Sequence, residues 1–210
     1  DELAETLQYN TLKASCNLAK EKGSCIKYNR TKYFTQEYIL PIKNKVLDKI
    51  IKRAPSLDWE SLWQNIAVHG LRNSTVTAQM PVESTSVIQN STNSIDPVRS
   101  LLSFKKSKSG LLKQLVPNFE KFKNYYTLAF DMKSNAGYNN CVASLQRWID
   151  MGISANAYYN YAHFEGNNIP LSLLINDMIS MYKLGFRTLY YTNTPDGDSE
   201  NSCPGGACTL

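Results

Sequence analysis

The residues best suited to redox chemistry stand close together near the end of the chain. Tyr190 and Tyr191 are adjacent, and a polar segment after them leads to Cys203 and Cys208. Tyrosine and cysteine can each lose an electron together with a proton, so two phenols followed by two thiols predict radical or thiol chemistry. The Pro-Gly-Gly-Ala stretch between the cysteines permits the tight bend that a disulfide ring requires. The alternatives are two aromatic residues that pack in a strand and a terminus without a selected role.

A hydroxyl-rich turn forms a second candidate site, ahead of a short apolar segment. Its residues are Pro81, Val82, Glu83, Ser84, Thr85 and Ser86. The first N–H groups of a helix lack partners within the helix and attract anions, so this turn is suited to holding a phosphate. Simple capping of the helix by the hydroxyl groups is the other interpretation. The sequence alone does not separate the two.

Other catalytic machinery is scarce. The two histidines, His69 and His163, have no zinc-ligand spacing, and the sequence has no serine-nucleophile, paired-carboxylate or glycine-rich nucleotide motif. The five cysteines are odd in number and irregularly spaced, which is typical of reduced thiols in a cytosol rather than of a secreted disulfide framework. No apolar run approaches the roughly 20 residues that cross a bilayer. We therefore expect a cytoplasmic protein without a bound metal or a membrane partner.

Basic residues crowd the segment from Arg99 to Lys123, although the net charge of the chain is only +5. A solvated surface explains such a run, and so does a phosphate-bearing or acidic partner. Together with a helix-turn pattern from Trp59 to Thr77, this basic segment (residues 99–123) supports an alternative function as a nucleic-acid-binding module. Salt-sensitive DNA binding would identify that class of protein.

Periodic apolar residues and turn signals predict an α/β fold. We expect helices over residues 2–22, 46–54, 59–69, 118–129, 138–151 and 170–184. We expect strands over residues 74–78, 100–104, 111–116, 153–159 and 188–191. The last strand, helix and strand imply a βαβ crossover with a parallel pair, and ligands gather at the carboxyl ends of such strands. Alternation in a flat strand would place the rings of Tyr190 and Tyr191 on opposite faces, whereas a strand that ends there would let them meet.

The apolar residues at helical spacing predict which side chains face a core. In segment 2–22 they are Leu3, Leu7, Ala14 and Leu18. In segment 170–184 they are Leu171, Leu174, Ile175, Met178, Ile179 and Tyr182. Asp58 is placed to cap the helix that carries Trp59 and Trp63. Cys141 belongs to the apolar stripe of segment 138–151, so we expect a buried, inert thiol there.

Taken in order, these motifs resemble the C-terminal part of the large, catalytic subunit of class I ribonucleotide reductase. The motifs that carry the resemblance lie at residues 18–23, 69–75, 80–86, 93–97, 153–156, 188–191 and 203–208. The resemblance implies the closing part of a ten-stranded α/β barrel over residues 1–191 and a flexible redox tail over residues 192–210. It also implies the reduction of ribonucleoside diphosphates to deoxyribonucleotides by radical chemistry.

The resemblance assigns roles to the two candidate sites. Residues 81–85 match the turn that binds the substrate diphosphate. Tyr190 and Tyr191 match the pair that relays a radical from a separate small, metal-bearing subunit toward an active-site cysteine. Cys203 and Cys208 match a tail dithiol that re-reduces the active-site disulfide and is itself reduced by thioredoxin or glutaredoxin. On this interpretation the chain binds no cofactor of its own and no nucleic acid.

The chain also departs from the family pattern. The family's radical cysteine, its two substrate-reducing cysteines and the asparagine and glutamate that assist them belong upstream of the matched part, and Cys16, Cys25 and Cys141 do not lie in those motifs. The resemblance therefore implies a component that is inactive alone and needs an upstream large-subunit piece, either as a fragment or as the downstream part of a split subunit of the kind met in phages. Val82 is apolar where some relatives carry a hydroxyl, which would remove a phosphate contact. A purely structural remnant is a further alternative.

Overall fold

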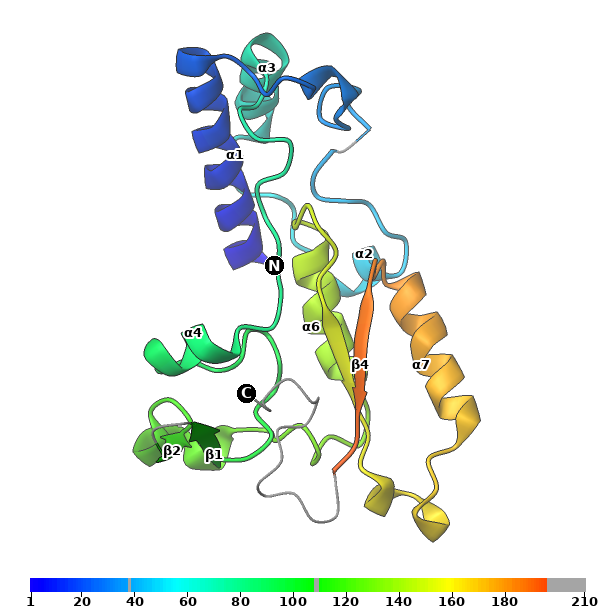
Figure 1. The fold of residues 1–210 in the computed structure, drawn as a ribbon. Coiled ribbons are helices and arrows are strands. Elements are labelled where there is room, and N and C mark those ends of the chain that lie inside the picture. The colour runs from blue at the N-terminus through cyan, green and yellow to red at the C-terminus, as the bar shows by residue number, and fades with distance from the viewer. Residues whose placement is uncertain (38, 108–109, 196–210) are drawn as a thin grey trace. The chain divides into compact units, whose positions relative to one another are not determined.

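Two compact units contain the helices and strands, within the described residues 1–37, 39–107 and 110–195 of a computed structural model (Figure 1). The first unit comprises Asp1–Gln79, Asn139–Ile153 and Ser180–Arg187. The second unit comprises, among the described residues, those of Met80–Tyr138, Ser154–Ile179 and 188–195. Each unit therefore combines segments that are far apart in the sequence.

Helices and aromatic side chains form the core of the first unit. Its helices include α1 (Glu2–Lys22), α2 (Leu47–Ile50) and α3 (Trp59–His69). α1 packs against α3, and the surrounding apolar cluster buries Leu12 and Ile66. Trp59 stacks on Trp148 with 5.4 Å between the ring centroids. Asp58 caps α3 as predicted, because its carboxylate accepts a hydrogen bond from the Ser61 N–H.

The buried face of α1 differs from the stripe that its leucines indicate. Leu3, Leu7 and Leu18 are exposed, Leu3 by 81%. The buried residues of this helix are Ala4, Glu5, Gln8, Leu12, Ser15, Cys16 and Ala19. Helical spacing cannot reveal such a face, because polar side chains are buried only where the fold supplies hydrogen-bond partners.

Glu5 is a fully buried carboxylate of α1. It accepts hydrogen bonds from the backbone N–H groups of Ser56 and Leu57, at 2.8 and 3.1 Å, and from the Trp59 indole at 3.0 Å. It also forms an ion pair with the Arg53 guanidinium. Burial by itself would raise the pKa of Glu5, but Arg53 and the three N–H donors outweigh it and lower this pKa to about 2.

Residues 74–78 do not form the predicted strand. Their backbone groups bond singly to a neighbouring loop instead of forming a ladder. The Val76 N–H donates to the Asp150 carboxylate at 2.6 Å, and the Met151 N–H donates to the Thr77 carbonyl at 3.2 Å. A β-rich composition therefore indicates an extended segment here, but it does not supply a partner strand.

Two predicted helices are much shorter in the structure, and the helix predicted over residues 138–151 ends earlier, at Gln146. Segment 46–54 contains only the four-residue α2, which ends in an extended residue. Segment 118–129 contains α5 (Phe119–Phe122) followed by a 3₁₀ turn (Lys123–Tyr125), because the next residue, Tyr126, is also extended. Both segments keep their helical start but not their predicted length.

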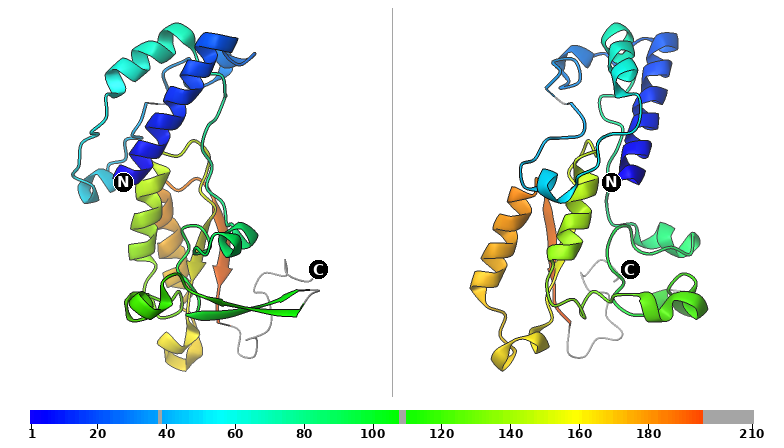
Figure 2. Two further views of the ribbon diagram at one scale, coloured as in Figure 1. Left: turned by 90° about the vertical axis from the view of Figure 1, so that its left-hand side faces the viewer. Right: turned by 180° about the vertical axis from the view of Figure 1, so that it is seen from behind.

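The second unit contains both sheets of the described chain. β1 (Leu102–Ser107) and β2 (Gly110–Leu115) form an antiparallel hairpin, which is seen clearly in Figure 2. β3 (Ala155–Tyr158) and β4 (Leu189–Asn193) form a parallel pair, with α7 (Leu171–Lys183) between them in the chain. The predicted hairpin strands and the predicted βαβ crossover are therefore confirmed.

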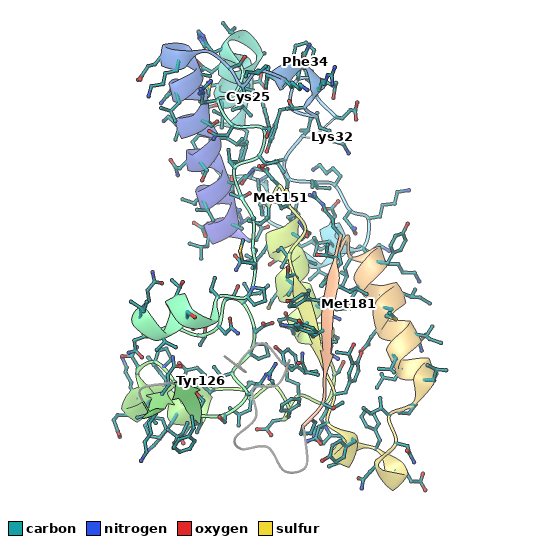
Figure 3. All side chains as sticks on the ribbon, viewed as in Figure 1. Cys25, Lys32, Phe34, Tyr126, Met151 and Met181 are labelled. Carbon is teal, nitrogen blue, oxygen red and sulfur yellow. The ribbon has the colours of Figure 1, made fainter. Side chains whose placement is uncertain are left out.

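Two predicted apolar stripes lie partly on exposed surfaces. Cys141 of α6 (Ala136–Gln146) is exposed, so the prediction of a buried thiol is wrong. On α7, Leu171 and Tyr182 are 69% and 80% exposed, whereas Met181, labelled in Figure 3, is only 3% exposed. Successive residues of an α-helix are about 100° apart around its axis, so a shift of one residue decides which side chain is buried.

The parallel pair and its helices confirm the α/β class, but the described residues form no closed barrel. The ten-stranded barrel stays a prediction. Within the described part of the chain, no helix is both long and apolar enough to cross a membrane. Residues 196–210, which include most of the predicted redox tail with Cys203 and Cys208, lie outside the described residues.

We expect Glu5→Gln to destabilise the protein by about 3 kcal/mol, because it leaves Arg53 without its buried partner and turns an amide N–H toward other donors. Urea denaturation measures this change. Glu21→Gln, on an exposed position of the same helix, is the matched control and should leave the free energy of unfolding nearly unchanged.

Acid titration gives a second test of the same carboxylate. The pKa of Glu5 falls from its ordinary value of 4.5 to about 2 on folding, so its stabilising effect is complete above about pH 4.5 and is lost as the pH falls toward 2. Glu5→Gln should remove this part of the pH dependence. An unchanged acid profile in the variant would contradict the assignment.

Candidate functional site

The two tyrosines lie at a β-bulge in β4. The strand pairing has a register shift, so that β4 places Tyr190 and Tyr191 opposite the single residue Asn156 of β3. The flanking pairs are Ala155 with Leu189 and Ala157 with Thr192. A bulge inserts one extra residue into a strand and interrupts the alternation of side chains between faces.

The bulge brings the two phenol rings together. The ring centroids of Tyr190 and Tyr191 are 4.0 Å apart, and the ring planes are inclined by 50°. Regular alternation would have separated the rings, as the sequence indicates for a flat strand. The two residues are 51% and 46% exposed, so each ring has one side against its neighbour and another that is accessible. The two rings therefore contact each other and keep accessible surface on which another redox-active group could bind.

A buried amide bonds to the backbone of the bulge. The Tyr191 N–H donates a hydrogen bond to Asn156 Oδ1 at 3.1 Å. Asn156 Nδ2 in turn donates to Asp96 Oδ2 at 2.7 Å, and the Tyr138 hydroxyl donates to Asp96 Oδ1 at 2.8 Å. Asn156 and Asp96 are only 4% and 9% exposed. A continuous chain of hydrogen bonds thus links Tyr138 to the backbone of Tyr191.

Burial controls the protonation of this chain of hydrogen bonds. It raises the pKa of Asp96, while the hydrogen bonds from Tyr138 and Asn156 oppose that rise. Burial also raises the pKa of Tyr138, and the neighbouring Asp96 carboxylate raises it further. Tyr138 therefore stays protonated and acts as a donor. The buried Tyr158 ring makes an edge contact with Tyr138 at a centroid distance of 6.1 Å.

Part of the basic segment (residues 99–123) belongs to the same region. The Arg99 guanidinium donates to Asn193 Oδ1, at the end of β4, at 2.9 Å. It also lies 6.0 Å from the centroid of the Tyr158 ring. Further along the segment, the Lys121 ammonium lies 4.9 Å from the centroid of the Phe122 ring. Arg99 therefore has a structural partner in β4, while the nucleic-acid function stays a prediction.

The hydroxyl-rich turn leads into a short helix, as predicted. This helix, α4 (Glu83–Ile88), has Val82 at its N-cap position and no side-chain capping bond. The Val82 N–H donates to Asn93 Oδ1 at 2.8 Å. Ser84 and Thr85 are exposed on the first turn. Their hydroxyls follow the N-cap position rather than occupying it, so simple capping does not explain the turn.

Sequence reasoning found the tyrosines but missed the chain of hydrogen bonds that ends at the Tyr191 N–H. Asp96 and Asn156 lie in two of the motifs that carry the family resemblance, yet nothing in their spacing indicates a mutual contact. Tyr138 begins the segment 138–151, for which the sequence predicts only a helix with an apolar stripe. The available signal was a polar Asn at the centre of the segment Ile153–Tyr159, since a buried amide in a strand requires a partner.

The fold and the tyrosine site define an α/β domain with a pair of redox-capable phenols. Comparison with known families identifies the family of this chain. The chain belongs to the ribonucleotide reductase family, a family of oxidoreductases. The model described as "Ribonucleotide reductase, barrel domain" matches residues 1–123 and 119–192. The resemblance drawn from the sequence motifs is thereby confirmed.

Relatives with curated names agree with the family. The chain is 45% identical over 214 residues to the ribonucleoside-diphosphate reductase subunit alpha of Haemophilus influenzae, covering 98% of this chain and 28% of the relative. It is 42% identical over 219 residues to the ribonucleoside-diphosphate reductase 1 subunit alpha of Escherichia coli, with the same coverage of 98% and 28%. The subunit alpha of Enterobacteria phage T4 is 39% identical over 198 residues, covering 93% of this chain and 26% of the relative. The chain thus spans little more than a quarter of the length of these relatives.

Proposed function

We propose that this chain is a component of the large subunit of a ribonucleoside-diphosphate reductase and takes part in converting ribonucleotides to deoxyribonucleotides by radical chemistry. The contact between the rings of Tyr190 and Tyr191, at 4.0 Å between centroids, is the observation that carries the proposal. The names of the relatives support the substrate class, since each is a ribonucleoside-diphosphate reductase subunit alpha.

The proposed role of the tyrosine pair is a relay. When one phenol meets the phenoxyl radical of the other, its O–H bond breaks and a new O–H bond forms on the neighbour. One electron and one proton therefore move between Tyr190 and Tyr191, with no net oxidation of the pair. The initial oxidant is a radical generated on a separate small, metal-bearing subunit. The electron and proton that refill the pair come from the S–H group of a cysteine on an upstream piece of the large subunit, which becomes the thiyl radical.

The turn formed by residues 81–85 is proposed to bind the substrate diphosphate. The Ser86 N–H makes a helical bond to the Val82 carbonyl, at 3.2 Å, so the N–H groups of residues 83–85 have no partner within the helix, whereas the Val82 N–H already donates to Asn93. Together with the hydroxyls of Ser84 and Thr85, these groups form a set of donors suited to phosphate oxygens. Val82 contributes no hydroxyl.

The two tail cysteines are proposed to supply the reducing equivalents. Reduction of a ribonucleotide to a deoxyribonucleotide and water converts two thiols to a disulfide, so each turnover requires a fresh dithiol. Cys203 and Cys208 would pass electrons to that disulfide by thiol–disulfide exchange and would be re-reduced by thioredoxin or glutaredoxin. The cysteines at the reacting centre would belong to the upstream piece, so the chain alone would be inactive, whether it is a fragment or part of a split subunit.

Tyr191→Phe is expected to abolish turnover of ribonucleoside diphosphates when this chain is combined with an upstream large-subunit piece and a small subunit. Phenylalanine keeps the ring but has no O–H bond to break. Tyr125→Phe, which changes a tyrosine that is 82% exposed, is the matched control and should retain activity. Substantial turnover by Tyr191→Phe would refute the relay.

Cys208→Ser is expected to stop turnover that depends on thioredoxin or glutaredoxin. Turnover supported by dithiothreitol should persist, because a small dithiol reaches the active-site disulfide without the tail. Cys141→Ser, at an exposed cysteine of α6, is the control and should behave like the unmodified protein with both reductants. Equal thioredoxin-dependent rates for Cys208→Ser and the control would exclude the proposed role.

Thr85→Val is expected to raise KM for the diphosphate substrate roughly tenfold with little change in kcat, because a hydrogen bond to a charged phosphate contributes about 1.5–3 kcal/mol. Steady-state kinetics of the reconstituted enzyme measure the effects on KM and on kcat separately. Ser172→Ala, at an exposed hydroxyl on α7, should leave KM unchanged. An unaltered KM in Thr85→Val would contradict phosphate binding by this hydroxyl.

A further inference from the structure

We propose that Asn156 and Asp96 are positioning residues for the tyrosine pair: Asn156 fixes the extra residue of the β4 bulge, and Asp96 fixes the orientation of Asn156. This inference deepens the proposed relay and rests on it for its functional consequence. Neither residue is proposed to exchange electrons with the phenols. Both act through the backbone of Tyr191.

The bulge in β4 requires a side chain that accepts a hydrogen bond from its backbone. In a regular parallel ladder the N–H groups of a strand bond to backbone carbonyls of its neighbour, and the extra residue of a bulge disrupts that pattern. Here the Tyr191 N–H bonds to a side chain, Asn156 Oδ1, at 3.1 Å. Asn156 is the residue of β3 that faces the two tyrosines in the register, so its side chain acts at the point of the irregularity.

Asp96 determines which way the Asn156 amide points. A carboxylate only accepts hydrogen bonds, so the partner of Asp96 Oδ2 at 2.7 Å must be the NH₂ group of Asn156. The amide oxygen is then directed to the Tyr191 N–H. The Tyr138 hydroxyl holds the other carboxylate oxygen at 2.8 Å, and the Asp96 N–H donates to the Asn93 carbonyl at 3.2 Å. The orientation of the amide is therefore fixed from both sides.

The distance between the two phenols depends on this arrangement. Tyr190 and Tyr191 meet only because one residue is added between the flanking pairs, and a regular register would return their rings to opposite faces. Loss of the Asn156 bond leaves the Tyr191 N–H of the bulge without its side-chain acceptor. The expected result is a change in ring contact rather than loss of the strand pair.

Exchanging the two polar residues provides a sharp test. In Asp96→Asn/Asn156→Asp, a carboxylate at position 156 accepts from the Tyr191 N–H and from the amide at position 96, whose oxygen accepts from Tyr138. The hydrogen bonds that link Tyr138 to the Tyr191 N–H are thus preserved, with the negative charge moved to position 156. Asn156→Asp alone places two carboxylates in contact, and Asn156→Ala removes the acceptor.

The experiment has two readouts in the full chain, with folding of every variant checked by urea denaturation. The first is the ¹⁹F resonance of 3-fluorotyrosine placed at position 190 or 191, which reports ring contact without any turnover. The second is kcat in the reconstituted reductase. Asn156→Ala and Asn156→Asp should shift both resonances and lower kcat by roughly 100-fold, as expected for a misplacement of about 1 Å, with KM unchanged. The exchanged double variant should restore both.

Two results would overturn the inference. One is an Asn156→Ala variant that is folded and keeps the resonances and kcat of the unmodified chain. The other is a double variant that is no closer to the unmodified chain than Asn156→Asp. Failure of the relay is distinguishable, because full turnover by Tyr191→Phe would refute the relay while the ¹⁹F shifts would still establish the positioning of the rings.

Discussion

The hydrogen bond from the Tyr191 N–H to the Asn156 side chain is the interaction on which the candidate site depends. It allows β4 to carry one residue more than β3 between two regular pairs. That extra residue places two adjacent phenols in contact instead of on opposite faces. A local irregularity of the sheet therefore brings the two tyrosine rings together. The buried Asp96 holds the Asn156 amide that bonds to this irregularity.

The site and the core of the first unit are each organised around a buried carboxylate. In each case a buried carboxylate organises donors from distant segments: Glu5 holds the loop before α3, and Asp96 holds Asn156 and Tyr138. The electrostatic outcomes differ. The donors around Glu5 include a guanidinium and lower its pKa, whereas burial dominates at Asp96 and raises its pKa. A buried carboxylate therefore fixes geometry in both units, and its surroundings shift its pKa in opposite directions.

Local features were predictable from the sequence, and long-range ones were not. The capped helix beginning at Trp59, the hairpin and the parallel βαβ unit follow from spacing and turn residues, and the family follows from ordered motifs. The register shift at Tyr190 leaves no periodic signal, because a bulge is defined by the partner strand. The contact between Asp96 and Asn156 joins residues that are far apart in the chain. The exposed Cys141 and the buried polar face of α1 depend likewise on neighbours that spacing does not specify.

We conclude that the bulge in β4 holds the two phenol rings in contact. Nuclear Overhauser measurements on protein with selectively labelled tyrosines test it directly, because they detect ring protons of one residue close to those of another. We expect strong ring-to-ring cross-peaks between Tyr190 and Tyr191. The contact would be contradicted if the two rings showed no cross-peaks to each other and each showed cross-peaks only to residues on opposite faces of the β3–β4 pair.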